Sequence, residues 1–326
     1  MSRICLYYRT EPEVDRWIPG DRLVRPAVRR MLRGARRPSG VDKVFENLCL
    51  GLKRLQVRYE VNLPFGQLDA DDWVGVLGVG RRSLQGYDRT NPIVAGVALM
   101  THPSEWPTLF EDYPVARYLQ HSAWADAIYR PWFGDKCAIW PVGIDTDKWS
   151  PSPGARPTVD FLIYNKIMGG DDRRVVMLDK VRGTLADRGF SFRTIRYGYY
   201  KPDEYLDDLQ SAKAMIFLSA HESQGIAYQE ALSCNVPVLA WDQGWWLDSN
   251  RFAWGETEVP ATSVPYWDSR CGLTFKDIDS FERQLADFVE RLETGVFSPR
   301  DYILENLTLG RRSQEYVDLL SAANRK

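Results

Sequence analysis

The sequence predicts an α/β fold with two Rossmann-like, doubly wound domains, each built on a parallel sheet. Short apolar runs alternate with helical patterns, and strands separated by helices pair in parallel through right-handed crossovers. A length of 326 residues is enough for two domains that each bury a core. Between the two halves, the run Ser150-Pro-Ser-Pro-Gly-Ala-Arg-Pro157 has the composition of an interdomain linker.

The first half, residues 1–150, contains five predicted strands and three predicted helices. The apolar runs that predict strands are 4–8, 57–61, 73–77, 93–99 and 137–140. The helical patterns are an arginine-rich segment at 22–36 and two further segments at 41–55 and 121–132. This order is typical of a doubly wound domain.

The second half alternates more regularly. Strands are predicted at 159–164, 190–197, 214–219 and 236–241, and helices at 171–188, 202–212 and 226–234. Together these elements form a second domain, residues 151–307, which is followed by a helical tail within 308–326. Ligands of such sheets bind at the carboxyl ends of the strands. We therefore expect the active site in the cleft between the domains.

Composition narrows the class of protein. The 42 Lys and Arg residues nearly balance the 44 Asp and Glu residues, so no overall field favours a nucleic-acid partner. Five scattered cysteines without a C-x-x-C pair fit a reducing compartment. No apolar stretch reaches the roughly 20 residues of a membrane span. We expect a cytoplasmic protein, with peripheral contact at the inner membrane face left open.

The segment from 214 to 240 carries the clearest chemistry. A buried strand leads to a loop with Glu222, then to Gly225 and a helix whose second turn holds Glu230. The N–H groups of Gly225 and Ile226 at the helix start attract a diphosphate, and a glycine there lets phosphate approach the backbone. Carboxylates accept paired hydrogen bonds from vicinal hydroxyls, which suits Glu230 to a ribose and Glu222 to a donor sugar.

These residues resemble the retaining glycosyltransferases of the GT-B fold, family-4 type, also called glycosyl transferases group 1. The family signature is two glutamates separated by seven residues, matched by Glu222 and Glu230, followed by a run matched by Ala231 and Pro237-Val238. The resemblance implies a hexosyltransferase that acts with retention, by a front-face mechanism without a metal or another cofactor. The donor would be a UDP-, GDP- or ADP-sugar.

Further landmarks of this family occur in the same order along the chain. A loop after the first strand of the donor domain bears two basic residues that neutralise the diphosphate. Lys166 matches the first residue, and Arg173 or Arg174 matches the second. Gly40 matches a glycine loop that lies against the donor phosphates. His102 follows the strand after which related enzymes place a histidine facing the donor sugar.

The resemblance therefore assigns roles to domains and residues. Residues 1–150 would face the acceptor, residues 151–307 would bind the nucleotide sugar, and a helix within 308–326 would cross back to the first domain. The predicted catalytic residues are His102, Glu222 and Lys166. The predicted donor-binding residues are Gly40, Lys166, Arg173, Arg174, Gly225, Ile226 and Glu230.

Simpler structural roles remain open for several of these residues. His102 precedes a proline, so it also fits a hydrogen-bonded turn, and Gly40 also fits an ordinary helix start. The two arginines also fit pairing with the neighbouring Asp171 and Asp172. The run Asp69-Ala-Asp71-Asp72 spells the metal-binding triplet of a different glycosyltransferase fold, but it precedes a strand in the wrong half, and we interpret it as an acidic turn.

The acceptor is suggested by the arginine-rich segment. Seven arginines between 22 and 37 alternate with apolar residues, which gives a helix one apolar stripe and one cationic face. Such a helix suits an anionic membrane or a lipid-linked glycan, and a role in polysaccharide biosynthesis. A helix packed on its own domain with a solvated basic face fits the pattern equally well.

Two other function classes remain. A sugar-nucleotide epimerase or hydrolase on the same fold would keep the nucleotide cradle, and analysis of products without an acceptor would separate it. A non-catalytic carbohydrate-binding protein would explain tryptophans in predicted loops, such as Trp245 and Trp246, because aromatic rings stack on sugars. It would not explain the two spaced glutamates.

Overall fold

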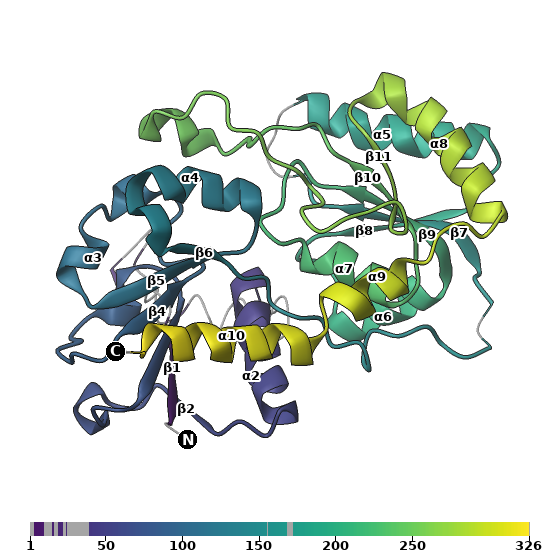
Figure 1. The fold of residues 1–326 in the computed structure, drawn as a ribbon. Coiled ribbons are helices and arrows are strands. Elements are labelled where there is room, and N and C mark those ends of the chain that lie inside the picture. Colours follow the sequence, from purple (N-terminus) through teal and green to yellow (C-terminus); the bar gives the residue numbers. More distant parts are fainter. Residues whose placement is uncertain are drawn as a thin grey trace. The chain divides into compact units, whose positions relative to one another are not determined.

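The computed structural model describes residues 3–9, 15, 19–21, 24, 39–154, 156–167 and 172–325, with the backbone alone at 172–175. These residues form two parallel sheets flanked by helices (Figure 1), so the predicted α/β class with two doubly wound sheets is confirmed. The predicted arginine-rich helix at 22–36 lies outside the described residues, apart from Val24.

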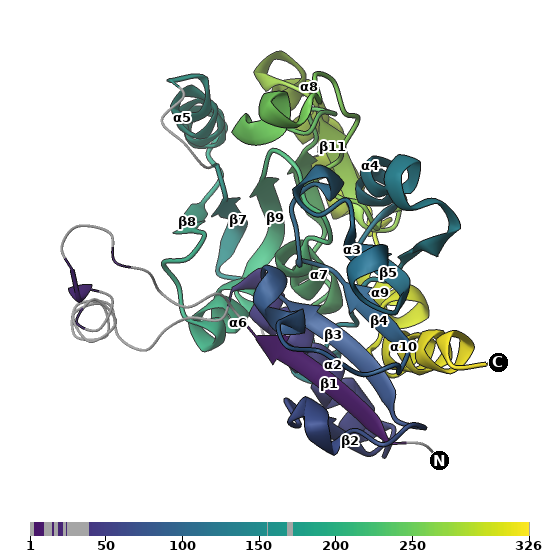
Figure 2. The ribbon, with the colours of Figure 1, turned by 90° about the vertical axis from the view of Figure 1, so that its left-hand side faces the viewer.

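The first sheet has the strand order β2-β1-β3-β4-β5-β6. Its strands are β1 (Ile4–Arg9), β2 (Tyr59–Val61), β3 (Trp73–Gly78), β4 (Ile93–Gly96), β5 (Val115–Gln120) and β6 (Cys137–Ile139). The α-helices described in this part of the chain are α2 (Gly40–Arg54), α3 (Leu109–Asp112) and α4 (Ala123–Phe133). Its short 3-10 helices are η1 (Phe65–Gln67), η2 (Arg81–Leu84), η3 (Pro103–Glu105) and η4 (Gly134–Lys136). Figure 2 shows β1, β3 and β4 side by side.

The second sheet has the order β11-β10-β9-β7-β8. Its strands are β7 (Val159–Asn165), β8 (Phe192–Arg196), β9 (Ala212–Leu218), β10 (Val238–Trp241) and β11 (Gly272–Phe275). The helices described in this later part of the chain are α5 (Asp172–Asp187), α6 (Pro202–Gln210), α7 (Ile226–Ser233), η5 (Ser249–Trp254), α8 (Ile278–Glu293), α9 (Pro299–Asn306) and α10 (Leu309–Ala323).

Alternation along the strands gives the second sheet two apolar faces. Phe161 and Ile163 of β7 join the core formed with α5 and α8. Tyr164 lies on the opposite face, where its ring packs against Phe217 of β9 and Tyr205 of α6. Figure 1 shows α5 and α8 on one side of this sheet and α6, α7 and α9 on the other. Successive side chains of a strand point to opposite faces, so one apolar strand supplies both cores.

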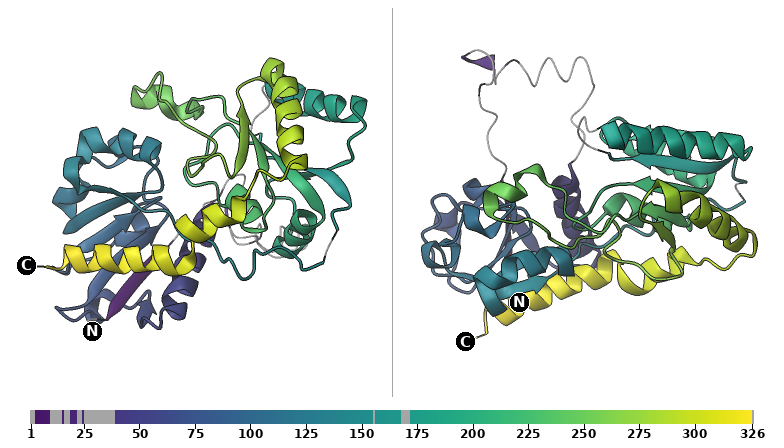
Figure 3. Two further views of the ribbon diagram at one scale, coloured as in Figure 1. Left: turned by 45° about the vertical axis from the view of Figure 1, so that its right-hand side comes forward. Right: turned by 90° about the horizontal axis from the view of Figure 1, so that it is seen from above.

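The chain forms two compact units, Met1–Leu119 with Tyr316–Lys326, and Gln120–Glu315. The predicted linker, 150–157, lies between β6 and β7, the last strand of the first sheet and the first strand of the second. The boundary of the compact units falls earlier, within β5. Figure 3 shows that α10 follows directly on α9. The second half of α10 belongs to the first unit, where the Tyr316 hydroxyl occupies the space that a side chain at Gly75 would need.

Two further findings concern the cysteines and the apolar character of the helices. Cysteines 5, 49, 137, 234 and 271 are all free of disulfide bonds. Among the described residues, no helix is both long enough and apolar enough to cross a membrane.

Candidate functional site

The centre of the candidate site is an ion pair between Lys166 and Glu222. The Lys166 Nζ lies 2.7 Å from Oε1 and 2.8 Å from Oε2 of Glu222. Lys166 follows the last residue of β7, and its N–H donates to the Leu218 carbonyl at the end of β9 at 2.8 Å. Because β7 and β9 pair in parallel, their carboxyl ends meet at one edge of the sheet. Parallel pairing thus unites two residues that are far apart in sequence.

Hydrogen bonds hold Glu222 in a fixed orientation. Its side chain accepts a bond from Ser219 Oγ at 2.8 Å, and the residue is only 8% exposed. Its N–H donates to the Thr262 carbonyl at 3.0 Å, and its carbonyl accepts from Trp124 Nε1 at 2.9 Å. Sequence reasoning missed these three partners. Sequence analysis could have predicted Ser219, because it directly follows β9. Trp124 and Thr262 are distant in sequence, and no local pattern marks them as partners of Glu222.

Gly225 begins α7 in the left-handed region, with φ +80° and ψ 45°. A Cβ atom at this position would overlap the ring of Tyr228, which is fully buried. The structure therefore gives this glycine a packing reason, whereas the sequence argument ascribed it to the close approach of phosphate. Ile226, the first residue of the helix, is 9% exposed.

Gln224 fixes the loop before α7. Its Oε1 accepts from the Val142 N–H at 2.9 Å, and its Nε2 donates to the Val142 carbonyl at 2.7 Å. This buried amide therefore satisfies both backbone polar groups of Val142. Sequence reasoning missed Gln224, because nothing local distinguishes it from any polar loop residue.

Glu230 lies in α7 and is 2% exposed. It and Glu222 both affect the same side chain, Tyr200. Burial is the main cause that raises the pKa of Tyr200, and the charges of Glu230 and Glu222 raise it further, against the effect of a hydrogen bond with Tyr164. That bond joins the two hydroxyls at 2.8 Å. Both signature glutamates therefore lie within electrostatic range of one tyrosine.

Two of the predicted site residues, Gly40 and His102, lie at the starts of helices in the first sequence half. Gly40 is the first residue of α2, after the N-cap Ser39, in the first compact unit. His102, also in that unit, is 1% exposed and caps η3. Its Nδ1 lies 2.7 Å from Ser104 Oγ and accepts from the Ser104 N–H at 3.2 Å, which is the turn role left open above.

Arg173 and Arg174 fall in the first turn of α5, and their side chains lie outside the described part of the chain. The pairing with Asp171 and Asp172 that was left open above lies outside it too.

The Asp69–Asp72 run is an acidic turn, as the sequence indicates. The Asp72 N–H donates to the Asp69 carbonyl at 3.1 Å, and the Asp72 carboxylate pairs with Arg3 at 2.5 Å. Asp72 is 2% exposed, so Arg3 already satisfies its charge. Within the described ranges, no group of three or more His, Cys, Asp and Glu side chains is placed to hold a metal ion.

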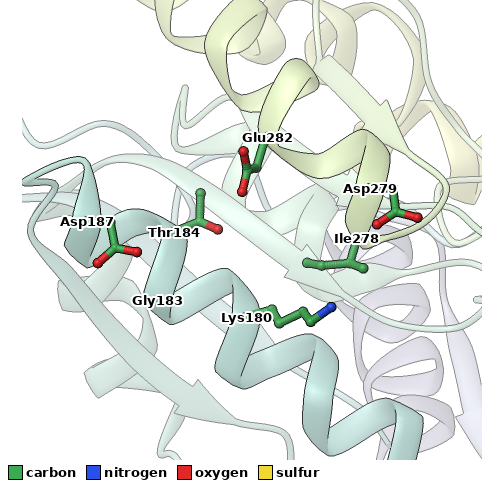
Figure 4. A pocket seen from close by; sticks show the side chains of 7 residues that line it. All are labelled: Lys180, Gly183, Thr184, Asp187, Ile278, Asp279 and Glu282. Atoms are coloured by element: carbon green, nitrogen blue, oxygen red, sulfur yellow. The ribbon is translucent and has the colours of Figure 1, made fainter.

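A surface pocket of about 550 Å³ lies elsewhere, between α5 and α8 (Figure 4). Its lining residues are Lys180, Gly183, Thr184, Asp187, Ile278, Asp279 and Glu282. None of the predicted site residues contributes to it. It lies between two helices that cover one side of the second sheet.

His121 is a second buried histidine, in the unit that holds the candidate site. Burial lowers its pKa from 6.5 to about 4, against a smaller raising effect of a backbone hydrogen bond with Trp140. The Nδ1 atom has no hydrogen-bond partner among the described residues. The ring is therefore stable in the fold only while it is neutral.

This burial predicts a pH-dependent loss of stability. The unfolded state binds a proton below pH 6.5 and the folded state only below about 4, so protonation favours unfolding in that window. We expect the contribution of neutral His121 to the free energy of unfolding to be fully present above pH 6.5. It should fall by about 3 kcal/mol as the pH drops towards 4. Urea unfolding at several pH values measures it, and His121→Gln is the control. If the free energy of unfolding changed equally with pH in wild type and His121→Gln, the prediction would be contradicted.

Comparison with known proteins was made at three levels. No protein-family model matches the chain, and no curated protein matches it. Solved structures do match. The apo form of the lipopolysaccharide outer core galactosyltransferase WaaB is similar with a TM-score of 0.55 at 11% identity, covering 98% of this chain and 99% of that one. A sucrose-phosphate synthase from Thermosynechococcus elongatus gives 0.56 at 12% identity, with 99% and 100% covered.

A third similar structure is the S. aureus TarM G117R mutant in complex with Fondaparinux, alpha-GlcNAc-glycerol and UDP. Its TM-score is 0.57 at 11% identity, and the match covers 85% of this chain and 58% of that chain. At such low identities, likeness establishes the fold. The chain therefore has the GT-B fold, as its resemblance to that class of glycosyltransferase implies.

Proposed function

We propose that the chain is a retaining glycosyltransferase that moves a hexose from a nucleoside-diphosphate sugar to a glycan or lipid-linked glycan. The observation that carries the proposal is the Lys166–Glu222 pair at the carboxyl edge of the second sheet, close to the start of α7. A cation suits the diphosphate, and the buried carboxylates of Glu222 and Glu230 suit the hydroxyls of sugar and ribose. The GT-B fold supports the same reading.

The proposed reaction needs no enzyme nucleophile. The acceptor oxygen bonds to the anomeric carbon on the face from which the diphosphate leaves, and the acceptor proton passes to the leaving phosphate. Lys166 and the backbone N–H groups at the start of α7 stabilise the charge that grows on the diphosphate. Arg173 or Arg174 and Gly40 complete the proposed phosphate contacts, and His102 faces the donor sugar. In this proposal the reaction requires no metal.

Two similar structures support a nucleotide partner. The TarM complex contains UDP. The pneumococcal O-GlcNAc transferase GtfA, with a TM-score of 0.51 at 11% identity, was determined with UDP and GlcNAc, and the match covers 60% of that chain. For this chain we keep UDP, GDP and ADP as candidate donor nucleotides. The arginine-rich 22–37 segment is the proposed contact with an anionic membrane face or a lipid-linked acceptor.

A thermal-shift screen tests the proposal. The protein is heated with UDP, GDP, ADP and their sugars, with EDTA or with manganese. One nucleotide should stabilise the fold without metal, by about 2.7 kcal/mol at a concentration about 100 times its Kd. Lys166→Met should abolish that shift. Lys213→Met is the matched control, since this exposed lysine pairs with Asp160 at 2.7 Å near the amino ends of β9 and β7, opposite the carboxyl ends that carry the site.

The outcome separates the three function classes. A shift with none of these nucleotides would contradict the proposal and favour the non-catalytic carbohydrate-binding protein. Release of free sugar or an epimerised nucleotide sugar without acceptor would favour the hydrolase or epimerase. Transfer to an added glycan, with product anomers matching the donor, supports the retaining transferase.

A further inference from the structure

A loop of three tyrosines follows β8 and lies beside the candidate site. It reads Tyr197-Gly198-Tyr199-Tyr200. The Tyr197 N–H donates to the Asn165 carbonyl at 2.9 Å, which ties the loop to the end of β7 next to Lys166. The Tyr199 N–H donates to the Arg196 carbonyl at 3.0 Å, and Gly198 has φ +77°, so the chain turns tightly here. The loop is therefore held at the edge where the strands end.

Two of the tyrosines contact the predicted donor-binding residues or their neighbours. The Lys166 ammonium lies 4.8 Å from the centre of the Tyr197 ring, and the Tyr200 hydroxyl bonds to Tyr164. These contacts place the loop next to the proposed diphosphate cation. Tyr200 also lies within range of Glu230, the proposed ribose ligand, as described above. A nucleotide bound by Lys166 and Glu230 would therefore extend its base towards this loop.

The third tyrosine is exposed. Tyr199 is 61% exposed, and the Arg196 guanidinium lies 4.7 Å from its ring centre. The guanidinium lies over one face of the ring, and a nucleobase can take its place there and stack, because every base has a π-face. Arg196 also supplies N–H donors. These suit bases with carbonyl acceptors, such as O4 of uracil or O6 of guanine, better than adenine, which has no carbonyl.

We infer that Tyr199 and Arg196 form the subsite for the donor base: the base takes the place of the guanidinium on the Tyr199 ring, and the displaced guanidinium donates to a base carbonyl. This inference rests on the proposed function. It narrows the donor to a uridine or guanosine nucleotide. It also gives two groups at the carboxyl edge of the second sheet different roles: Lys166 binds the diphosphate, and the turn after β8 selects the base.

Isothermal titration of the full chain with UDP, GDP, ADP and inorganic pyrophosphate tests the inference. Wild type should bind UDP or GDP more tightly than ADP. Tyr199→Ala should weaken binding of the preferred nucleotide by about 10-fold or more and leave pyrophosphate binding unchanged, since stacking involves the base alone. Tyr199→Phe should retain wild-type affinity. Arg196→Gln should reduce the preference for the carbonyl-bearing base.

The matched control is Phe252→Ala. Phe252 is 60% exposed and lies under the Arg251 guanidinium at 4.1 Å, so it repeats the arginine–aromatic pair on the loop that carries η5. It should leave all four affinities unchanged. Unaltered nucleotide affinity in Tyr199→Ala, or an equal loss for pyrophosphate, would overturn the inference. In that case, weaker nucleotide binding by Lys166→Met would leave the proposed function standing. A wild type that binds none of the four probes would overturn both.

Discussion

Replacing Glu222 with glutamine is expected to lower the rate of sugar transfer by about 100-fold or more, because a charged hydrogen-bonding partner of the sugar is lost. Affinity for the nucleoside diphosphate should stay the same or rise. In the free structure Glu222 holds the Lys166 ammonium with both oxygens. A neutral amide of similar size releases that ammonium to the diphosphate. Under the proposed function, donor binding therefore exchanges one anion for another at Lys166.

Initial rates and calorimetric affinities for the diphosphate measure the two effects separately. Lys166→Met should weaken diphosphate binding, in the opposite direction to Glu222→Gln. Glu204→Gln is the control, since Glu204 also pairs with a lysine, Lys201, but is exposed in α6. If Glu222→Gln weakened diphosphate binding as strongly as Lys166→Met, the hypothesis that Lys166 exchanges Glu222 for the diphosphate would be contradicted.

The strength of a local pattern explains which elements sequence analysis predicted. The tail helix is found at Leu309–Ala323, within the predicted tail, because its apolar positions recur with helical spacing. β5 is absent from the predicted strands, since Arg117 breaks a short apolar run that follows a proline. The predicted strand 93–99 ends at Gly96 in the structure. The predicted elements also omit α8. Its buried residues Phe281, Leu285 and Phe288 recur at helical spacing, so the sequence could have predicted this helix.

The candidate site likewise contains residues that the sequence predicts and contacts that it does not. Lys166 and Glu222 are both loop residues after neighbouring parallel strands, so topology alone predicts that they lie close together. Their supporting contacts depend on tertiary packing. Trp124 reaches the Glu222 carbonyl from α4, and Gln224 pairs with Val142, and neither contact follows from spacing or composition. Sequence therefore predicts the charged groups of the site better than it predicts what orients them.

Gly225→Ala is expected to destabilise the fold by about 2–4 kcal/mol. The left-handed conformation at φ +80° costs a residue with a Cβ about 1–2 kcal/mol. The new methyl group must also displace Tyr228, whose hydroxyl accepts from the Tyr266 N–H at 3.1 Å. Because Tyr228 is fully buried, its ring has no free space to move into. Urea unfolding of wild type and variant measures the loss.

A double-mutant cycle decides which reason for this glycine dominates. If it makes room for the ring, Gly225→Ala should cost only the backbone strain of about 1–2 kcal/mol in a Tyr228→Ala background. The full cost should persist in Tyr228→Phe, which keeps the ring. If close approach of phosphate is the main reason, stability should change equally in all backgrounds while nucleotide affinity falls. The ring contact in the structure favours the first result, in which Gly225 shapes the proposed phosphate site indirectly, by letting Tyr228 pack against the start of α7.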